Sequence, residues 1–300
     1  MPSPALFDRS LLAARRTRAL RAARAGSDFL LAAVAEDLAD RLSTITRVFG
    51  HAVDLGGHTG HVAALLRASG KAETVLRGDL FVADPSLPPP DFVFDDALLP
   101  LADASVGLVV SALSLHFVND LPGTLIQIRR ALRPDGLFLG ALLGGDTLSE
   151  LRDVLMRAEL ESSGGAAPRV APFADTRDLG TLLQRAGFAL PVTDADRITV
   201  RYASLFDLMA DLRAMGATSA LTERSRKPLA RSVFLRAAEL YAQDHADPDG
   251  RIRATFQVVS LLGWAPHESQ QKPLRPGSAK MRLADALGVA GGAPAGRKKD

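Results

Sequence analysis

Short apolar runs alternate with amphipathic segments along the first half of the chain. The runs that are apolar enough for buried strands lie at 51–55, 74–78, 91–94, 106–111 and 137–141. Apolar residues recur at helical spacing in the segments before and between them, at 5–25, 29–42, 60–69 and 121–132. The nearly continuous run at 106–111 is typical of a central strand that is covered on both faces. This alternation predicts an α/β fold with a doubly wound, mostly parallel sheet.

The pattern changes after residue 145. Helices are predicted at 147–161, 178–186, 204–214 and 228–243, and strands at 198–202 and 255–264. We expect Asp146 or Thr147 to cap the first of these helices. Either Asp175 or Thr176 is expected to cap the second. Earlier in the chain, the Pro- and Gly-containing segment 133–136 predicts a turn.

We expect four parts along the chain. Two N-terminal helices occupy 1–45, and the core of the sheet occupies 46–145. A helical insertion and C-terminal strands at 146–270 complete the same domain. The segment 271–300 is rich in Pro, Gly and Ala and predicts a largely disordered tail.

The composition is that of an ordinary globular protein. The chain has 300 residues, of which 47% are hydrophobic, and a formal net charge of only +2. With 5% aromatic residues and no strong basic excess, we expect no nucleic-acid partner. The chain has no cysteine, which excludes disulfides and cysteine-ligated zinc or iron–sulfur centres. The chain contains no run of about 18 apolar residues, so no transmembrane helix is predicted.

Arginines are concentrated near the N-terminus, at Arg15, Arg16, Arg18, Arg21 and Arg24. Such a segment resembles a transit peptide. In a chain this rich in Ala and Arg, we favour a basic amphipathic helix. The same arginines could contact an anionic partner or a membrane surface, so peripheral membrane association stays open.

A glycine-rich segment at 52–63 follows the first predicted strand. Gly56, Gly57 and Gly60 permit backbone conformations that a side chain would block. Asp54, at the end of the strand, supplies an acceptor for an ammonium or hydroxyl group of a ligand. A strand, a glycine-rich turn and a helix N-terminus together are typical of a nucleotide site. Such turns also serve helix packing, so the motif has to be tested against the rest of the sequence.

Acids follow the next two predicted strands. Asp79 lies 79 − 60 = 19 residues after Gly60, a spacing suited to accepting the ribose hydroxyls of a nucleoside. Asp95 and Asp96 follow the third strand, where they could accept from an adenine amine. Ser111 ends the fourth strand. The carboxyl ends of parallel strands form the usual ligand crevice of an open sheet, so these residues predict a nucleoside site.

The order of these motifs resembles that of class I S-adenosylmethionine-dependent methyltransferases. The similarity rests on Asp54-Leu55-Gly56, Asp79, Asp96 with Pro100-Leu101, and Leu132-Arg133-Pro134-Asp135-Gly136. Further segments resemble the complex I assembly factor 5 family of arginine hydroxylases and its bacterial relatives, at 111–122, 144–152, 171–173 and 263–270. The resemblance covers roughly residues 5–285. BioC-like malonyl-acyl-carrier-protein methyltransferases are more distantly similar.

The resemblance implies a Rossmann-like domain that binds S-adenosyl-L-methionine. By similarity, the cofactor-binding residues are Asp54, Gly56, Gly57, His58, Gly60, Asp79, Asp95, Asp96 and Ser111. The implied partner is a protein substrate, an iron–sulfur subunit of an NADH dehydrogenase in which one arginine is hydroxylated. The implied location is the cytoplasm or the periphery of the inner membrane in a bacterium, and the mitochondrial matrix in a eukaryote.

One position departs from the family pattern. His58 stands where the usual Asp-x-Gly-x-Gly-x-Gly motif has its middle glycine. That glycine lets the backbone pass close to the methionine moiety, so the imidazole must point away or occupy ligand space. His58 therefore bears on cofactor affinity and on whether methyl transfer is the reaction.

His116 follows the central strand and is the candidate catalytic residue. It is either a general base or substrate contact, or a residue that only packs over the sheet. A metal site built from His58, His61 or His116 with Asp79 or Asp96 lacks ligand spacing, so we expect no metal.

Three functions remain open from the sequence. The first is an enzyme acting on a protein side chain, by arginine hydroxylation during complex I assembly. The second is a BioC-like O-methyltransferase acting on a carrier-protein or small-molecule carboxylate. The third is a non-catalytic complex I assembly chaperone that keeps the fold.

Overall fold

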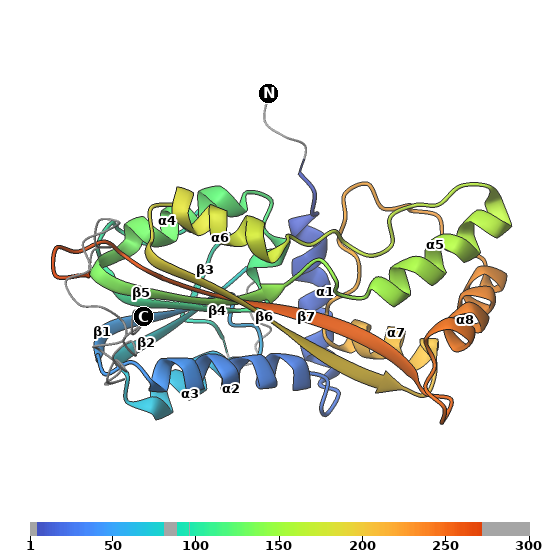
Figure 1. Ribbon diagram of the computed structural model, residues 1–300, viewed down its shortest axis with the longest axis horizontal. Coiled ribbons are helices and arrows are strands. Elements are labelled where there is room, and N and C mark those ends of the chain that lie inside the picture. The colour runs from blue at the N-terminus through green and yellow to red at the C-terminus, as the bar shows by residue number, and fades with distance from the viewer. Residues whose placement is uncertain (1–4, 81–88, 96, 272–300) are drawn as a thin grey trace, which may run out of the picture. The chain divides into compact units, whose positions relative to one another are not determined.

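A seven-stranded sheet organises the protein, with strand order β3-β2-β1-β4-β5-β7-β6 (Figure 1). The computed structural model describes residues 5–80, 89–95 and 97–271. The strands are β1 Phe49–Leu55, β2 Ala72–Asp79, β3 Phe92–Val93, β4 Val106–Ala112, β5 Leu132–Leu143, β6 Ala189–Tyr202 and β7 Ile252–Trp264. Strands β1 to β5 pair in parallel, whereas β7 is antiparallel to both β5 and β6. The predicted mostly parallel, doubly wound sheet is confirmed.

Helices cover both faces of the sheet (Figure 1). They are α1 Arg9–Ala22, α2 Phe29–Ser43, α3 His61–Ser69, α4 Leu121–Ala131, α5 Ser149–Ser163, α6 Thr176–Arg185, α7 Leu205–Ala214 and α8 Arg231–His245, with a short 3-10 helix η1 at Leu115–Phe117. Helices α2 and α3 lie on one face, and α4 and α6 on the other. The N-terminal helices expected from the sequence are present.

Side chains of β4 alternate between the two faces. Val109 packs in the cluster under α4 and α6, whereas Leu108 and Val110 pack in the cluster under α2 and α3. All three are at most 2% exposed. This alternation has the period of two that a strand imposes, and both faces are covered. The central, buried strand predicted here is confirmed.

A third cluster lies under α5, α7 and α8, beyond the parallel part of the sheet (Figure 1). It includes Val154 of α5, Leu208 of α7, Ala237 of α8 and Phe256 of β7, each at most 1% exposed. The long antiparallel strands β6 and β7 therefore carry a second helical layer beside the first. Its inner surface becomes one wall of the cavity described below.

Two predicted elements differ from the structure. Strand β6 begins at Ala189 rather than at 198, because this edge strand is largely exposed and carries few apolar residues. The segment 133–136 is not a turn between elements but an irregular part of β5. There the register with β4 shifts between Val106 and Leu108, and Asp135 has a φ of 63°. These features mark an irregularity in the pairing of β5 with β4.

The predicted cap of α5 is wrong. The N-cap residue is Leu148, with a φ of 53° and no side-chain hydrogen bond to the helix. Thr147 instead exchanges hydrogen bonds with the backbone of Gln257, and Asp146 pairs with Arg197. Both polar side chains therefore tie the loop after β5 to the antiparallel strands.

The predicted cap of α6 is confirmed. The Asp175 side chain accepts a 2.7 Å hydrogen bond from the N–H of Arg177. Asp28 occupies the N-cap position of α2, but its side chain makes no capping bond.

The compact unit that holds the sheet runs to Pro266. Beyond it, the structure describes a short turn in which the Gln270 N–H donates to the His267 carbonyl. The predicted tail lies outside the described residues from 272 onward, and the division into four parts stays a prediction. In the part of the chain that the structure describes, no helix is long and apolar enough to cross a membrane.

Candidate functional site

The glycine-rich segment folds as a tight turn between β1 and α3. Gly56 and Gly60 have φ values of 76° and 87°, and His58 has a φ of 40°. The N–H of Gly56 donates to the Gly78 carbonyl of β2 over 2.9 Å. A Cβ on Gly56 would lie 2.1 Å from Ser114 Oγ, so the protein's own packing requires glycine here. The predicted arrangement of strand, turn and helix is present.

Asp54 lies buried beneath this turn. Its Oδ2 accepts from the Ala63 N–H of α3 over 3.0 Å. Its Oδ1 is buried and has no hydrogen-bond partner among the described residues. Burial raises the pKa of this carboxyl to about 7. The unsatisfied oxygen is suited to an ammonium or hydroxyl donor, as the sequence predicted.

Asp79 ends β2 and is 2% exposed. Its Oδ2 accepts from the His58 N–H and its Oδ1 from the Leu80 N–H, each over 2.7 Å. Arg16 Nη1 of α1 lies 3.9 Å from Asp79 Oδ1. Asp79 therefore joins the end of β2 to the glycine-rich turn and to α1.

The other predicted cofactor residues have varied positions. Ser111 is fully buried, and its Oγ donates to the Leu55 carbonyl over 2.8 Å, which ties β4 to β1. Asp95 is partly exposed and pairs with Arg9 of α1 over 3.3 Å. Asp96 lies outside the described residues. The turn, Asp54 and Asp79 are thus brought together, whereas Ser111 has a structural partner.

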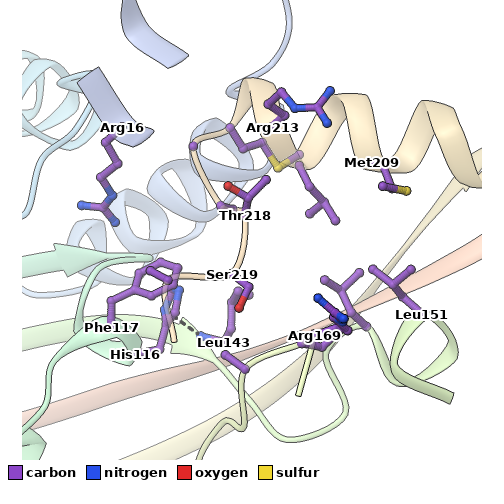
Figure 2. A pocket seen from close by; sticks show the side chains of 18 of the residues that line it. Arg16, His116, Phe117, Leu143, Leu151, Arg169, Met209, Arg213, Thr218 and Ser219 are labelled. Carbon is purple, nitrogen blue, oxygen red and sulfur yellow. Dashed lines mark hydrogen bonds between the residues drawn. The ribbon is translucent and has the colours of Figure 1, made fainter. Parts of the chain in front are cut away.

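A cavity of about 430 Å³ adjoins the turn. Figure 2 shows Arg16, His116 and Phe117 at one end and Leu151 and Met209 at the other. Further walls come from His58, the end of β5, the loop 169–173 and the segment 215–229. Its size is that of a small-molecule site. Among the described residues that were predicted to bind the cofactor, only His58 lines this cavity.

His58 therefore borders the cavity. Burial and the nearby Arg16 lower the pKa of His58 to about 3. The imidazole is neutral at physiological pH. The sequence left two alternatives, pointing away or occupying ligand space; the place of His58 in the cavity lining supports the second, which stays a prediction.

His116 lies in η1, against the rings of Phe117 and Phe173. Its Nδ1 accepts from the Leu143 N–H over 3.4 Å, so we assign the ring hydrogen to Nε2. Burial lowers the pKa of His116 to about 3. A neutral imidazole of this tautomer is a hydrogen-bond donor through Nε2. The predicted roles of His116, as a general base or substrate contact or as a residue that only packs over the sheet, stay predictions.

Most side chains that line the cavity are apolar, and the charged side chains among them are mostly basic. Asp28 is the one acid among the described lining residues, and it binds His61 over 2.6 Å. The Arg169 guanidinium forms two hydrogen bonds with Glu159. The basic side chains of the lining are Arg16, Arg169, Arg213, Arg226 and Lys227. The last three are exposed at the surface.

The sequence prediction missed Arg16 and the segment 215–229. Arg16 shares a helical face with Leu12 and Ala19, and all three are buried. That spacing is a signal that an arginine points inward. Nothing in the sequence of 215–229 indicates a cavity wall. The described residues include no group of three or more potential metal-binding His, Cys, Asp or Glu side chains. The expectation of no metal stays a prediction.

A family profile described as "Methyltransferase domain" matches residues 28–191. The chain therefore belongs to the methyltransferase superfamily, and the resemblance seen in the sequence is confirmed. It is similar to the human mitochondrial arginine-hydroxylase NDUFAF5, with 39% identity over 98% of this chain and 86% of that protein. The NDUFAF5 of Danio rerio is 39% identical over 86% of this chain and 82% of that protein.

The chain is also similar to a second kind of enzyme and to a solved structure. A malonyl-[acyl-carrier protein] O-methyltransferase of Laribacter hongkongensis is 34% identical over 85% of this chain and 90% of that protein. The crystal structure of the YcgJ protein of Bacillus subtilis has a TM-score of 0.53 and 12% identity, covering 77% of this chain and 99% of that one. The latter likeness is one of fold alone and supports the Rossmann-like assignment.

Proposed function

We propose that the chain binds S-adenosylmethionine at the carboxyl edge of β1, β2 and β4 and acts on a protein side chain. The reaction we favour is hydroxylation of an arginine in an NADH dehydrogenase subunit during complex I assembly, in which an oxidant other than S-adenosylmethionine, such as dioxygen with a two-electron donor, would have to supply the oxygen. The human relative, 39% identical over 98% of this chain, is named as an arginine hydroxylase. In a bacterium this reaction belongs to the cytoplasm or the inner-membrane periphery, and in a eukaryote to the mitochondrial matrix.

The residues at this edge fit the cofactor. The unpartnered Asp54 Oδ1 would accept from the cofactor's ammonium, and Asp79 would accept from its ribose hydroxyls. A Cβ on Gly57 would lie 2.4 Å from Asp54 Oδ2, so this carboxyl and the turn are closely packed. When bound, S-adenosylmethionine supplies a sulfonium with a transferable methyl group.

The cavity is the observation that carries the proposal. The cavity has a volume of about 430 Å³, is lined by His58 of the turn and by His116, and is otherwise mostly apolar. A side chain of a protein substrate would enter this cavity and meet the Nε2–H of His116. The aromatic and aliphatic walls would exclude water from it.

The cations of the cavity favour a second candidate, O-methylation of a carboxylate. Arg213, Arg226 and Lys227 would attract an acidic group and repel a guanidinium. The relative from Laribacter is named as acting on a malonyl group attached to acyl carrier protein. Methyl transfer requires mainly the alignment of the carboxylate with the sulfonium.

Mass spectrometry separates these reactions. Complex I subunits are isolated from cells with and without the gene, and the masses of their arginine-containing peptides are compared. We expect one peptide to lose the mass of one oxygen in the deletion strain. A methyl ester on an acyl-carrier substrate, formed by the purified protein, would instead support the second candidate. Failed assembly with no altered peptide and no methyl ester would support the chaperone hypothesis.

A further inference from the structure

The N-terminal helix α1 places a buried arginine at the carboxyl edge of the sheet. Arg16 is 6% exposed and lies on the same helical face as Leu12 and Ala19. Helix α1 precedes the region 28–191 that matches the methyltransferase family. Arg16 therefore adds a charged group to the crevice from outside the family's common core.

The Arg16 guanidinium lies over the ends of β2 and β4. Its Nη2 donates to the Leu113 carbonyl over 3.2 Å, and its Nη1 is 3.9 Å from Asp79 Oδ1. Its Cζ lies 5.5 Å from the centroid of the Phe117 ring. Figure 2 shows the side chain reaching from α1 toward His116 and Phe117. Arg16 thus faces the carboxylate that the ribose of the proposed cofactor requires.

Contacts at the start of α1 hold the helix in this position. Phe7 and Asn119 exchange two hydrogen bonds, of 2.7 and 3.0 Å. Arg9 Nη1 donates to the Phe117 carbonyl over 2.9 Å. The Asp8 N–H donates to the Ala220 carbonyl over 2.8 Å. The helix is therefore anchored both to the loop after β4 and to the segment before α8.

We propose that Arg16 belongs to the cofactor site and competes with the cofactor's ribose for Asp79, so that α1 controls cofactor entry. This inference rests on the proposed function. Asp79 already accepts two backbone N–H groups, and Arg16 faces its Oδ1. The ribose hydroxyls gain their partner only when the guanidinium moves away from Asp79. The apparent affinity for the cofactor then equals the intrinsic affinity multiplied by the fraction of molecules in which Arg16 has moved away from Asp79.

The test is calorimetry on the full chain with S-adenosylmethionine and S-adenosylhomocysteine. Arg16→Met keeps an aliphatic chain against Phe117 and removes the charge. We expect it to tighten the binding of both ligands by about tenfold. Arg18→Met is the matched control, because Arg18 is exposed on the same helix and its loss changes the net charge equally. We expect Arg18→Met to leave both affinities unchanged.

The two ligands separate competition from simple charge repulsion. S-adenosylhomocysteine lacks the positive sulfonium, so a gain for S-adenosylmethionine alone, or an equal gain in Arg18→Met, would overturn the competition. Asn119→Ala provides a second variant, which loosens the anchor of α1 and leaves Arg16 itself unchanged. It should also tighten both ligands. Circular dichroism melting verifies that each variant is folded.

The remaining outcomes distinguish this inference from the proposed function. If the wild-type protein binds and Arg16→Met binds equally or more weakly, Arg16 does not compete with the cofactor, and this inference alone is overturned. If neither the wild-type protein nor any variant binds either ligand, the inference and the proposed cofactor both fail.

Discussion

The backbone N–H of His58 donates a 2.7 Å hydrogen bond to Oδ2 of Asp79. This bond joins the glycine-rich turn to the end of β2. It also holds His58 in the left-handed region, with a φ of 40°, where a residue with a side chain is strained. The turn therefore keeps the backbone of a glycine-rich motif while carrying an imidazole toward the cavity.

Replacing His58 by glycine should relieve the strain and open the ligand side of the turn. We expect His58→Gly to bind S-adenosylmethionine more tightly than the wild-type protein. The free energy of unfolding should change by less than about 1 kcal/mol, because relief of strain offsets the greater entropy of the unfolded chain. Calorimetry and denaturant unfolding measure the two effects. Weaker binding would mean that the imidazole contacts the cofactor favourably.

Asp54 should make stability depend on pH. Its pKa is raised by burial to about 7, so the folded protein holds a proton that the unfolded chain releases above about pH 4. This group therefore stabilises the fold less as the pH rises from about 4 to about 7. Asp54→Asn removes that loss and should be more stable at pH 8, by up to about 4 kcal/mol.

Denaturant unfolding at pH 5 and pH 8 measures this effect. The difference between Asp54→Asn and the wild-type protein should be larger at pH 8. A difference that is equal at the two pH values would show that the Asp54 carboxyl is ionised throughout. Asp95→Asn is a suitable control, because Asp95 is partly exposed.

His116 should act through its N–H rather than as a base. His116→Gln keeps a side-chain N–H donor and should retain a large part of the activity, whereas His116→Phe should lose about 10²-fold or more. If His116 were a general base, both variants would lose activity alike. Turnover of the substrate identified by mass spectrometry is the measurement, and Tm verifies that each variant is folded.

Charge reversal at the cavity mouth should report the substrate's charge. For an arginine-containing substrate, Lys227→Glu removes a repulsion, and we expect KM to fall by about threefold. The effect should weaken at high salt. A rise in KM would indicate an acidic substrate and favour carboxylate methylation. Arg185→Glu, on the exposed end of α6 and outside the cavity lining, is the matched control.

The parallel half of the fold could be predicted because burial on both faces leaves a simple signal. Strand β4 is apolar at nearly every position, and the motif at Asp54 follows a similarly buried strand. Strand β6 was only partly predicted. Its residues 189–197 lie on a sheet edge, where polar side chains such as Asp194 and Asp196 are tolerated.

The site was predicted less completely than the fold, for a different reason. Motif spacing indicates which strands end near one another, so Asp54 and Asp79 could be placed together. The approach of Arg16 depends on how α1 packs against segments more than about 90 residues away, such as Leu113 and Ala220. Local pattern carries little information about such long-range contacts. The methyltransferase-domain profile also carries no information on Arg16, because the region that it matches begins at residue 28.

The position of β7 has a consequence for how the protein is made. This strand, Ile252–Trp264, lies between β5 and β6 although it follows both in sequence. While the chain emerges from the ribosome, the edge of β5 that pairs with β7 in the folded protein lacks this partner until β7 has been made. The sheet is therefore completed only after nearly the whole chain has been synthesised. Until then, the hydrogen-bonding edge of β5 is unpaired, which is the kind of edge at which partly folded chains associate.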